Sequence, residues 1–376
     1  MSKRILFVVH NLKIGGIQKI TLDTARFHAN QGNDVTILLL EDKVDLNVDF
    51  NCKIEHIALS KYLLARPWLA LFYGLYKAIL RKVLPKSEFV WAGILYRPIF
   101  EKFIKKNNNF NAIFINGVRS MNHLHSIDQT NVVYSLHLPH SLTKNSNNTP
   151  YYNFLFKKLF SNKRIFTVSD FIRQPIQDKV ESLGVDLKAL KTIYNPCDIN
   201  KISTMANEPI DYPSPYILGV GRLTKQKRFD RLIEAYKKAN IKPNLIILGD
   251  GNQKEALEQQ ISQLGLQNKV FLKGFDKNPF RWMKNANFFV LSSDVEGFVL
   301  VINEALACGT PVVATNCGPV TEILSGELSK GIADKNSDDL AKKIQLFSHQ
   351  PVTPSSEVIK KLTFDEIVKQ QLSLLK

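Results

Sequence analysis

The chain has 376 residues, a formal net charge of +16 and an apolar fraction of 44%, which allows two domains with substantial cores. No stretch approaches the roughly 18 uncharged apolar residues of a membrane-spanning helix, and the N-terminal sequence lacks the apolar run of a signal peptide. We therefore expect a cytoplasmic protein without spanning helices. Its four cysteines form no C-x-x-C pair, so reduced thiols rather than a zinc site are expected: Cys52, Cys197, Cys308 and Cys317.

The N-terminal sequence predicts a strand–turn–helix–strand unit. The strand covers Arg4 to His10, the helix Ile17 to Gln31, and the next strand Asp34 to Leu40. Gly15 and Gly16 lie in the turn, where glycines allow the backbone to approach a ligand closely, although plain turn residues are an alternative. The pattern is not G-x-G-x-x-G, so we do not expect a dinucleotide site.

Half of the net charge lies between Lys61 and Lys106, where ten Lys or Arg residues face two acidic ones. Apolar residues recur there at helical spacing in two runs. The runs are Leu63, Leu64, Trp68, Leu71, Phe72, Leu75 and Ile79, then Phe89, Trp91, Ile94, Leu95, Ile99, Phe100 and Phe103. Basic helices with such faces are typical of binding to an anionic membrane surface. The alternative is that the helices pack in a core and expose a basic back.

Further buried strands are predicted at residues 112–116, 132–136 and 165–168. His137 follows the second, and a residue at a strand's carboxyl end is placed to meet a ligand in an open α/β sheet. A loop histidine without a role is the alternative. His123 and His125 form an H-x-H pair, which alone is weak evidence for a metal.

The polar, Pro-bearing stretch from Asn195 to Pro215 is interpreted as the interdomain linker. A second α/β series follows it. Its predicted strands cover 216–220, 245–248, 270–272, 288–291 and 312–314, with helices at 228–239, 253–264, 278–285, 337–347 and 364–375. Alternation of strands and helices indicates a mainly parallel sheet in each half.

The stretch from Phe288 to Thr315 carries two carboxylates around a predicted helix that begins near Phe298. Glu296 lies in the preceding loop, and Glu304 lies roughly 9 Å along the helix axis. The first N–H groups of such a helix suit phosphate oxygens. The pair therefore fits a sugar–diphosphate–ribose ligand, and a solvated charge pair is the alternative.

Two other loops of the second half should meet this one at the carboxyl edge of the sheet. One brings Arg222 and Lys227, which match the charge of a diphosphate. The other is the tight loop Gly249 to Gly251. No Asp-x-Asp follows a strand end, so the sequence does not indicate a metal that chelates the diphosphate.

The second half resembles the donor domain of the family 4 retaining glycosyltransferases. The matching stretches are GVGRLTKQKRFDRLIEA (219–235), LGDG (248–251), VFLKGF (270–275) and EGFVLVINEALACGTPVVAT (296–315), with its Glu-x7-Glu spacing. The Gly-Gly turn in HNLKIGGIQK (10–19) also looks like that family's acceptor-domain loop. The resemblance is thinner between Asp42 and Ser161, and Arg228 and Val299-Leu300 depart from the usual residues.

The resemblance implies a GT-B fold, with two Rossmann-like doubly wound α/β domains facing across a cleft, and a UDP-sugar co-substrate without a metal or other cofactor. Glu296 and His137 would serve the chemistry at the sugar, and Arg222 and Lys227 would hold the diphosphate. Glu304 would bind the ribose. The remaining donor-site residues implied are Gly15, Gly16, Gly249, Gly251, Phe275, Phe298, Val299 and Leu300.

We expect an acceptor-binding domain at 1–200, a donor domain at 201–360, and a C-terminal helix at 361–376 packing back on the first. The predicted function is retaining sugar transfer to a hydroxyl of a lipid-linked saccharide in bacterial lipopolysaccharide, O-antigen or capsule assembly. The protein would bind the inner face of the membrane through the Lys61–Lys106 segment. Alternatives are a GT-B nucleotide-sugar epimerase and a basic nucleic-acid-binding protein, but no nucleic-acid module is recognisable.

Overall fold

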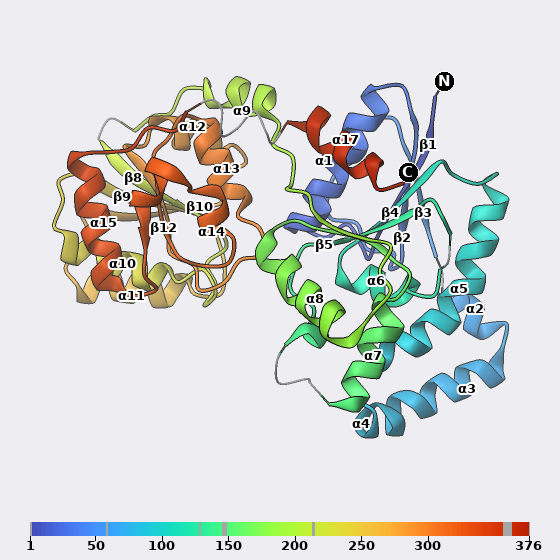
Figure 1. The fold of residues 1–376 in the computed structure, drawn as a ribbon. Helices are drawn as coiled ribbons and strands as arrows, with labels where there is room; N and C mark the ends of the chain where they lie inside the picture. Colours follow the sequence, from blue (N-terminus) through green and yellow to red (C-terminus); the bar gives the residue numbers. More distant parts are fainter. Residues whose placement is uncertain are drawn as a thin grey trace. The chain divides into compact units, whose positions relative to one another are not determined.

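The computed structural model describes residues 2–57, 59–127, 129–144, 149–212, 215–355 and 363–375. The chain divides into two compact units (Figure 1). Unit 1 runs through Tyr194 and also takes in the segment from Ile367 onward, and unit 2 runs from Asn195 to Glu366. Each unit is an α/β structure around one parallel sheet.

The sheet of unit 1 has seven parallel strands. In spatial order they are β3 (Lys53–His56), β2 (Asp34–Leu39), β1 (Arg4–Val9), β4 (Ala112–Asn116), β5 (Val132–Leu136), β6 (Arg164–Thr167) and β7 (Ala189–Thr192). The order reverses between β1 and β4. In open α/β sheets, ligands bind beyond the carboxyl ends of the strands at such a switch point.

The helices of unit 1 connect these strands. They are α1 (Gly16–Asn30), α2 (Leu59–Leu64), α3 (Pro67–Leu75), the π-helix η1 (Tyr76–Leu80), α4 (Arg81–Val83), α5 (Glu88–Lys106), α6 (Val118–Leu124), the 3₁₀ turn η2 (Ser141–Thr143), α7 (Pro150–Phe160), α8 (Asp170–Leu183) and most of α17 (Phe364–Ser373).

Unit 2 repeats the same topology with six parallel strands. Their order is β10 (Val270–Gly274), β9 (Asn244–Leu248), β8 (Tyr216–Val220), β11 (Phe288–Leu291), β12 (Val312–Thr315) and β13 (Ile332–Ala333). The switch point lies between β8 and β11. The helices are α9 (Ile199–Ala206), α10 (Phe229–Ala239), α11 (Lys254–Gln263), α12 (Pro279–Asn285), α13 (Leu300–Ala307), α14 (Val320–Ile323), the 3₁₀ helix η4 (Gly326–Gly331) and α15 (Ser337–His349).

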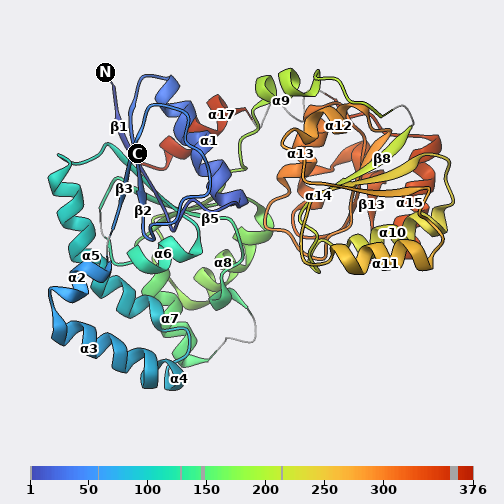
Figure 2. The same ribbon diagram turned by 180° about the vertical axis from the view of Figure 1, so that it is seen from behind.

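Helices cover both faces of the sheet in unit 2. On one face, α10, α11 and α15 lie together (Figure 2) and pack on alternate strand residues such as Leu245, Ile247 and Val290. On the other face, α9 packs against α12 and α13. Burial on both faces explains why the strands are continuous apolar runs rather than alternating ones.

Two segments differ from the sequence prediction. The stretch interpreted as a linker contains α9, and its contacts place it within unit 2. Helix α13 begins at Leu300, two residues after the predicted start near Phe298, and Val299 is its N-cap residue. Glu304 consequently lies only about 6 Å along the helix from its first residue.

The Lys61–Lys106 segment forms several short helices and the long helix α5. Helix α5 buries Phe89, Leu95 and Phe100, so the core-packing alternative holds for its apolar side. Helix α3 contains no buried residue among those whose side chains are described. The first apolar run of the segment therefore does not form a core face along α3. Figure 1 draws α3 and α4 at the periphery of unit 1.

Candidate functional site

Two loops meet at the switch point of unit 2. The loop after β8 spans residues 221–228, and the loop after β11 spans residues 292–299. The amide of Asp294 donates to the Gln226 carbonyl (3.0 Å), and the Ser292 hydroxyl donates to the Lys227 carbonyl (2.9 Å). These bonds join residues more than 60 positions apart, so the edge of the sheet rather than local sequence brings the loops together.

Lys227 and Glu296 form an ion pair at this edge. The ammonium nitrogen of Lys227 lies 2.7 Å from Oε1 of Glu296, and the side chains are 21% and 11% exposed. The Ser293 hydroxyl donates to the same carboxylate oxygen at 2.7 Å. The structure thus brings together the two side chains that the sequence resemblance assigns to the diphosphate and the sugar.

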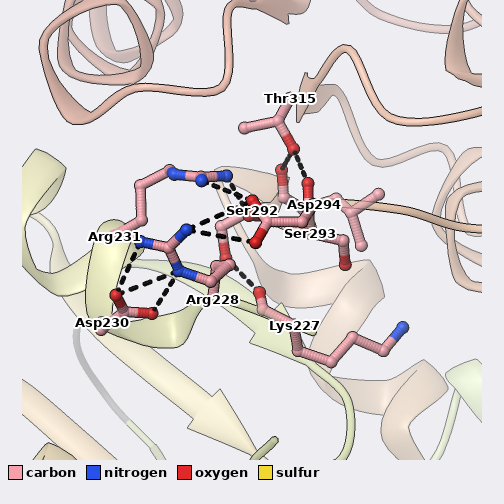
Figure 3. A network of polar contacts seen from close by, with 9 residues as sticks. Lys227, Arg228, Asp230, Arg231, Ser292, Ser293, Asp294 and Thr315 are labelled. Carbon is pink, nitrogen blue, oxygen red and sulfur yellow. Dashed lines mark hydrogen bonds and ion pairs between the residues drawn. The ribbon is translucent and has the colours of Figure 1, made fainter. Parts of the chain in front are cut away.

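A second charged network supports the same loops (Figure 3). Asp294 accepts from Arg228 at 3.1 Å and from Arg231 at 2.5 Å. Arg231, which is 6% exposed, also donates to the Ser292 carbonyl at 3.0 Å. Arg228 binds Asp230 as well and adopts a left-handed backbone, φ 52°, which favours glycine.

This network keeps Asp294 ionised. Burial alone would raise the pKa of its carboxyl, but the hydrogen bonds from Arg231 and Arg228 hold the pKa below its usual range. Asp294 is two residues before Glu296, so its anchoring fixes the loop that carries Glu296. Neither Asp294 nor Arg231 is among the site residues predicted from the sequence. The signal in the sequence was an Asp two residues before the first Glu of the Glu-x7-Glu motif, together with the basic residues Arg228 and Arg231 at the start of a predicted helix.

Glycines pack these loops tightly. A Cβ at Gly249 would lie 1.9 Å from the Gly221 carbonyl oxygen, and a Cβ at Gly251 would lie 2.4 Å from that of Leu223. Gly318, with φ +63°, similarly meets the Glu296 carbonyl at 2.2 Å. Gly249 and Gly251 therefore bring backbone close to backbone around the site, and Gly318 is a supporting residue that the sequence analysis did not single out.

Arg222 and Phe275 stand exposed at the same edge. Arg222 follows β8, and no partner of its guanidinium is found in the described part of the chain. Phe275 directly follows β10 and is 75% exposed. A solvent-facing cation and aromatic ring at the carboxyl ends of parallel strands are typical of ligand contacts.

Helix α13 completes this side of the site. Its N-cap, Val299, provides no side-chain hydrogen bond to the first turn, and the first N–H groups of an α-helix have no acceptor within the helix. Glu304 lies one turn along the helix. Burial is the main cause that raises the pKa of Cys308 to about 12, and the negative charge of Glu304 adds to this effect.

Three of the predicted residues belong to unit 1. Gly15 is the N-cap of α1, and Gly16 is its first residue. His137 follows β5 and is buried, with Nε2 3.0 Å from the Ser135 hydroxyl. Burial lowers the pKa of His137 to about 4, so its imidazole is neutral near pH 7.

Among the residues that the structure describes, no helix is long and apolar enough to cross a membrane. These residues also contain no group of three or more His, Cys, Asp or Glu side chains that could hold a metal ion, and this covers the His123-x-His125 pair.

The chain is similar in sequence to known glycosyltransferases. The family profile "Glycosyl transferases group 1" matches residues 200–363. The N-acetylgalactosamine-N,N'-diacetylbacillosaminyl-diphospho-undecaprenol 4-alpha-N-acetylgalactosaminyltransferase of Campylobacter jejuni is 30% identical over 290 residues, 75% of this chain and 73% of that protein. An uncharacterized glycosyltransferase of Methanocaldococcus jannaschii is 37% identical over 193 residues, 47% of each protein.

Solved structures share the fold over 99% of this chain. Anabaena HepE, crystallised with UDP and glucose, has a TM-score of 0.68 at 20% identity and covers 99% of both chains. The apo lipopolysaccharide outer core galactosyltransferase WaaB has a TM-score of 0.67 at 16% identity, again covering 99% of both. At these identities the likeness concerns the fold alone.

The predicted GT-B fold is confirmed by the two parallel-sheet units and by these structural neighbours. The 30% identity that extends over nearly three quarters of the Campylobacter enzyme identifies the chemistry as glycosyl transfer. This chain therefore belongs to the group 1 glycosyl transferases.

Proposed function

We propose that the protein is a family 4 retaining glycosyltransferase that moves a sugar from a UDP-sugar to a hydroxyl of a lipid-linked saccharide. The observation that carries the proposal is the Lys227–Glu296 pair beside the exposed Arg222, at the carboxyl edge of unit 2. The HepE structure holds UDP and glucose. The name of the Campylobacter relative specifies a diphospho-undecaprenol saccharide. Both support this donor and acceptor class.

The donor diphosphate is assigned to Arg222 and Lys227. Arg suits bidentate contact with phosphate oxygens, and an ammonium group has three N–H donors. Lys227 can therefore keep its bond to Glu296 and still reach a phosphate. Together with the N–H groups at the start of α13, these cations balance the leaving group's charge, and the proposed reaction uses no metal.

Glu296 is assigned to the hydroxyls of the transferred sugar, and Glu304 to those of the ribose. Phe275 offers a face on which the uracil base can stack. Val299 is buried, so the segment Phe298–Leu300 contributes through its backbone. The loop bonds from Ser293 and the anchored Asp294 hold Glu296 in one orientation before the donor arrives.

Retention follows from front-face transfer. The bond from the sugar's anomeric carbon to the phosphate oxygen breaks while the acceptor oxygen bonds to that carbon on the same face. The acceptor's proton passes to the departing phosphate oxygen. Glu296 then orients the donor and does not attack it. In this proposal His137 is a neutral hydrogen-bonding group for the sugar, consistent with its lowered pKa.

The acceptor class is supported by an exposed apolar surface on unit 1, which we call the α3–α4 surface. Its members and their exposures are Trp68 (69%), Leu71 (73%), Leu75 (53%), Ile79 (56%) and Val83 (69%). Arg66, the N-cap residue of α3, and Lys82 of α4 are exposed in the same segment. Apolar side chains beside cations fit the interface of an anionic membrane. We therefore propose peripheral attachment to the inner membrane face during lipopolysaccharide, O-antigen or capsule assembly.

The test is UDP release by the full-length protein. A panel of UDP-sugars is incubated with and without undecaprenyl-diphosphate saccharides, and the product's anomeric configuration is determined by NMR. We expect one UDP-sugar to release UDP mainly when acceptor is present, with the donor's configuration retained. An inverted product, or conversion of the nucleotide sugar with no UDP released, would contradict the proposal, and the second outcome would support an epimerase.

A further inference from the structure

Arg228 has a backbone conformation that favours glycine. Its φ of 52° and ψ of 44° lie in the left-handed region, directly before the first residue of α10. A residue with a Cβ is strained there, whereas glycine is not. The Arg228 side chain makes no capping hydrogen bond to the helix. Stabilising the start of α10 by a cap therefore does not explain the arginine, and strained residues of this kind cluster at functional sites.

The guanidinium of Arg228 joins two carboxylates from different elements (Figure 3). Nε donates to Oδ1 of Asp230 and Nη2 donates to Oδ2, both at 3.0 Å. Nη1 donates to the two oxygens of Asp294, at 3.3 and 3.1 Å. A planar guanidinium that is held through two nitrogens has a fixed direction. Asp230, in the first turn of α10, therefore directs Nη1 of Arg228 towards Asp294 in the loop after β11.

The Arg228–Asp294 bond lies beside the Lys227–Glu296 pair. Arg228 directly follows Lys227, and Asp294 lies two residues before Glu296. Gln226, on the other side of Lys227, donates from its side chain to the backbone carbonyl directly before Glu296, at 2.8 Å. Side chains on both sides of Lys227 therefore hold the loop that carries Glu296.

Donor binding engages the Lys227–Glu296 pair but not the Arg228–Asp294 bond. In the proposed function the ammonium group of Lys227 also contacts the diphosphate, and Glu296 contacts the transferred sugar. Each group then divides its hydrogen bonds between the protein and the donor. Neither Arg228 nor Asp294 is assigned to the donor, so the bond between them is available throughout. Because both partners are charged, it is stronger than a neutral hydrogen bond.

We propose that Arg228 is a positioning residue for the transfer reaction. Through Asp294 it fixes Glu296 relative to the loop that carries Lys227, so that the carboxylate meets the sugar while the diphosphate is held. The assignment rests on the proposed function, since it takes Glu296 as the group that orients the sugar. Arg228 acts through Asp294 rather than on the donor itself, and the orientation that it provides offsets the strain of its backbone.

The first test measures the mobility of the loop without turnover. Arg228→Gly removes the guanidinium and introduces a residue that suits the left-handed backbone. We expect amide hydrogen exchange of peptides within residues 292–299 to become several-fold faster, with the rest of unit 2 unchanged and the thermal midpoint not lowered. Unchanged exchange of these peptides, or faster exchange throughout unit 2, would overturn the proposal.

Asn240→Gly is the matched control for the backbone change. Asn240 also has a left-handed backbone, φ 46°, but it is the exposed C-cap residue at the other end of α10. This variant should leave both the exchange of residues 292–299 and the kinetics unchanged. The same change in Asn240→Gly as in Arg228→Gly would assign the effect to the backbone rather than to the guanidinium, and would overturn the proposal.

The second test separates catalysis from binding. In Arg228→Gly and in Asp294→Asn we expect kcat to fall about tenfold, because the sugar is no longer held in one orientation. The Kd for UDP should not change, since UDP lacks the transferred sugar and both Arg222 and Lys227 remain. Adding Arg228→Gly to Asp294→Asn should cause no further loss, because both changes break the same bond. A parallel loss of UDP affinity and thermal stability would show a merely structural role.

Glu296→Ala, measured alongside, distinguishes failure of this proposal from failure of the proposed function. Loss of turnover in Glu296→Ala together with normal kcat in Arg228→Gly would overturn the role of Arg228 alone. Normal turnover in a folded Glu296→Ala variant would overturn the role of Glu296, and the role of Arg228 with it.

Discussion

The two units have the same sheet order around their switch points but different polar side chains at them. Unit 2 presents Lys227, Glu296 and Arg222, with Asp294 held between two arginines. Unit 1 presents His10 and His123, whose pKa values are lowered mainly by burial, beside the ion pair of Glu41 and Lys43. A shared topology therefore places polar side chains at the strand ends of both units, whereas the residues at those ends differ. The charged edge of unit 2 carries the groups that we propose for the diphosphate.

The largest expected effect comes from removing the carboxylate of the charged edge. Glu296→Ala should lower kcat about a thousandfold, since it removes the group that we propose orients the sugar at the reacting centre. Initial-rate kinetics with the cognate UDP-sugar measure this, and circular dichroism and the thermal midpoint show whether the variant is folded. Near-normal turnover in a folded variant would exclude Glu296 from the chemistry.

Acid should destabilise unit 1 before unit 2. Five buried histidines of unit 1 have pKa values lowered to about 4, mainly by burial: His28, His123, His125, His137 and His140. The pKa of these histidines in the folded state lies below the value near 6.5 of the unfolded state. Their contribution to the free energy of unfolding is therefore fully present above pH 6.5 and is lost as the pH falls towards 4. Unit 2 contains only His349, which is exposed.

The acid effect should reach several kcal/mol in total, because one pKa unit corresponds to about 1.4 kcal/mol. Hydrogen exchange between pH 7 and 5, corrected for intrinsic rates, should show peptides of unit 1 losing protection first. His28→Phe keeps a ring against Phe7 and Phe114 and removes one titrating group. It should make the pH dependence shallower. Earlier loss of protection in unit 2 would contradict the comparison.

Removing one cation from the charged edge should have an intermediate effect. Arg222→Ala should weaken UDP binding about tenfold, as expected for loss of one charge-assisted contact to phosphate. Calorimetric titration at two salt concentrations measures the loss. Lys225→Ala, an exposed lysine in the same loop, is the matched control and should bind UDP normally. If both variants lost affinity equally, general charge rather than a specific contact would be responsible.

The smallest effect is expected at the α3–α4 surface. Trp68→Ser and Leu71→Ser should each reduce binding to vesicles containing anionic lipid several-fold, since each removes exposed apolar area available for burial. Co-sedimentation with and without phosphatidylglycerol, at low and high salt, measures it. Leu346→Ser alters an exposed leucine of α15 and should leave vesicle binding unchanged. Binding that ignored lipid charge and salt would contradict an anionic membrane partner.

The sequence by itself determined the alternation of strands and helices and the residues of the charged edge. Apolar runs bounded by Gly and Pro locate strands such as β8 and β11, since burial on both faces leaves a local pattern. The Glu-x7-Glu spacing and Arg222 with Lys227 identified the donor-site candidates. These features are local, so one short window of the chain contains each of them.

Only the tertiary structure decided which groups meet. Lys227 and Glu296 are 69 positions apart, and His10 and His123 come from different strand–helix units, so their pairing depends on strand order. It also decided that α3 buries none of its residues while α5 buries Phe89, Leu95 and Phe100, although the two runs look alike in sequence. Burial is a property of the packed molecule, and burial is the main cause of the lowered pKa values of five histidines of unit 1.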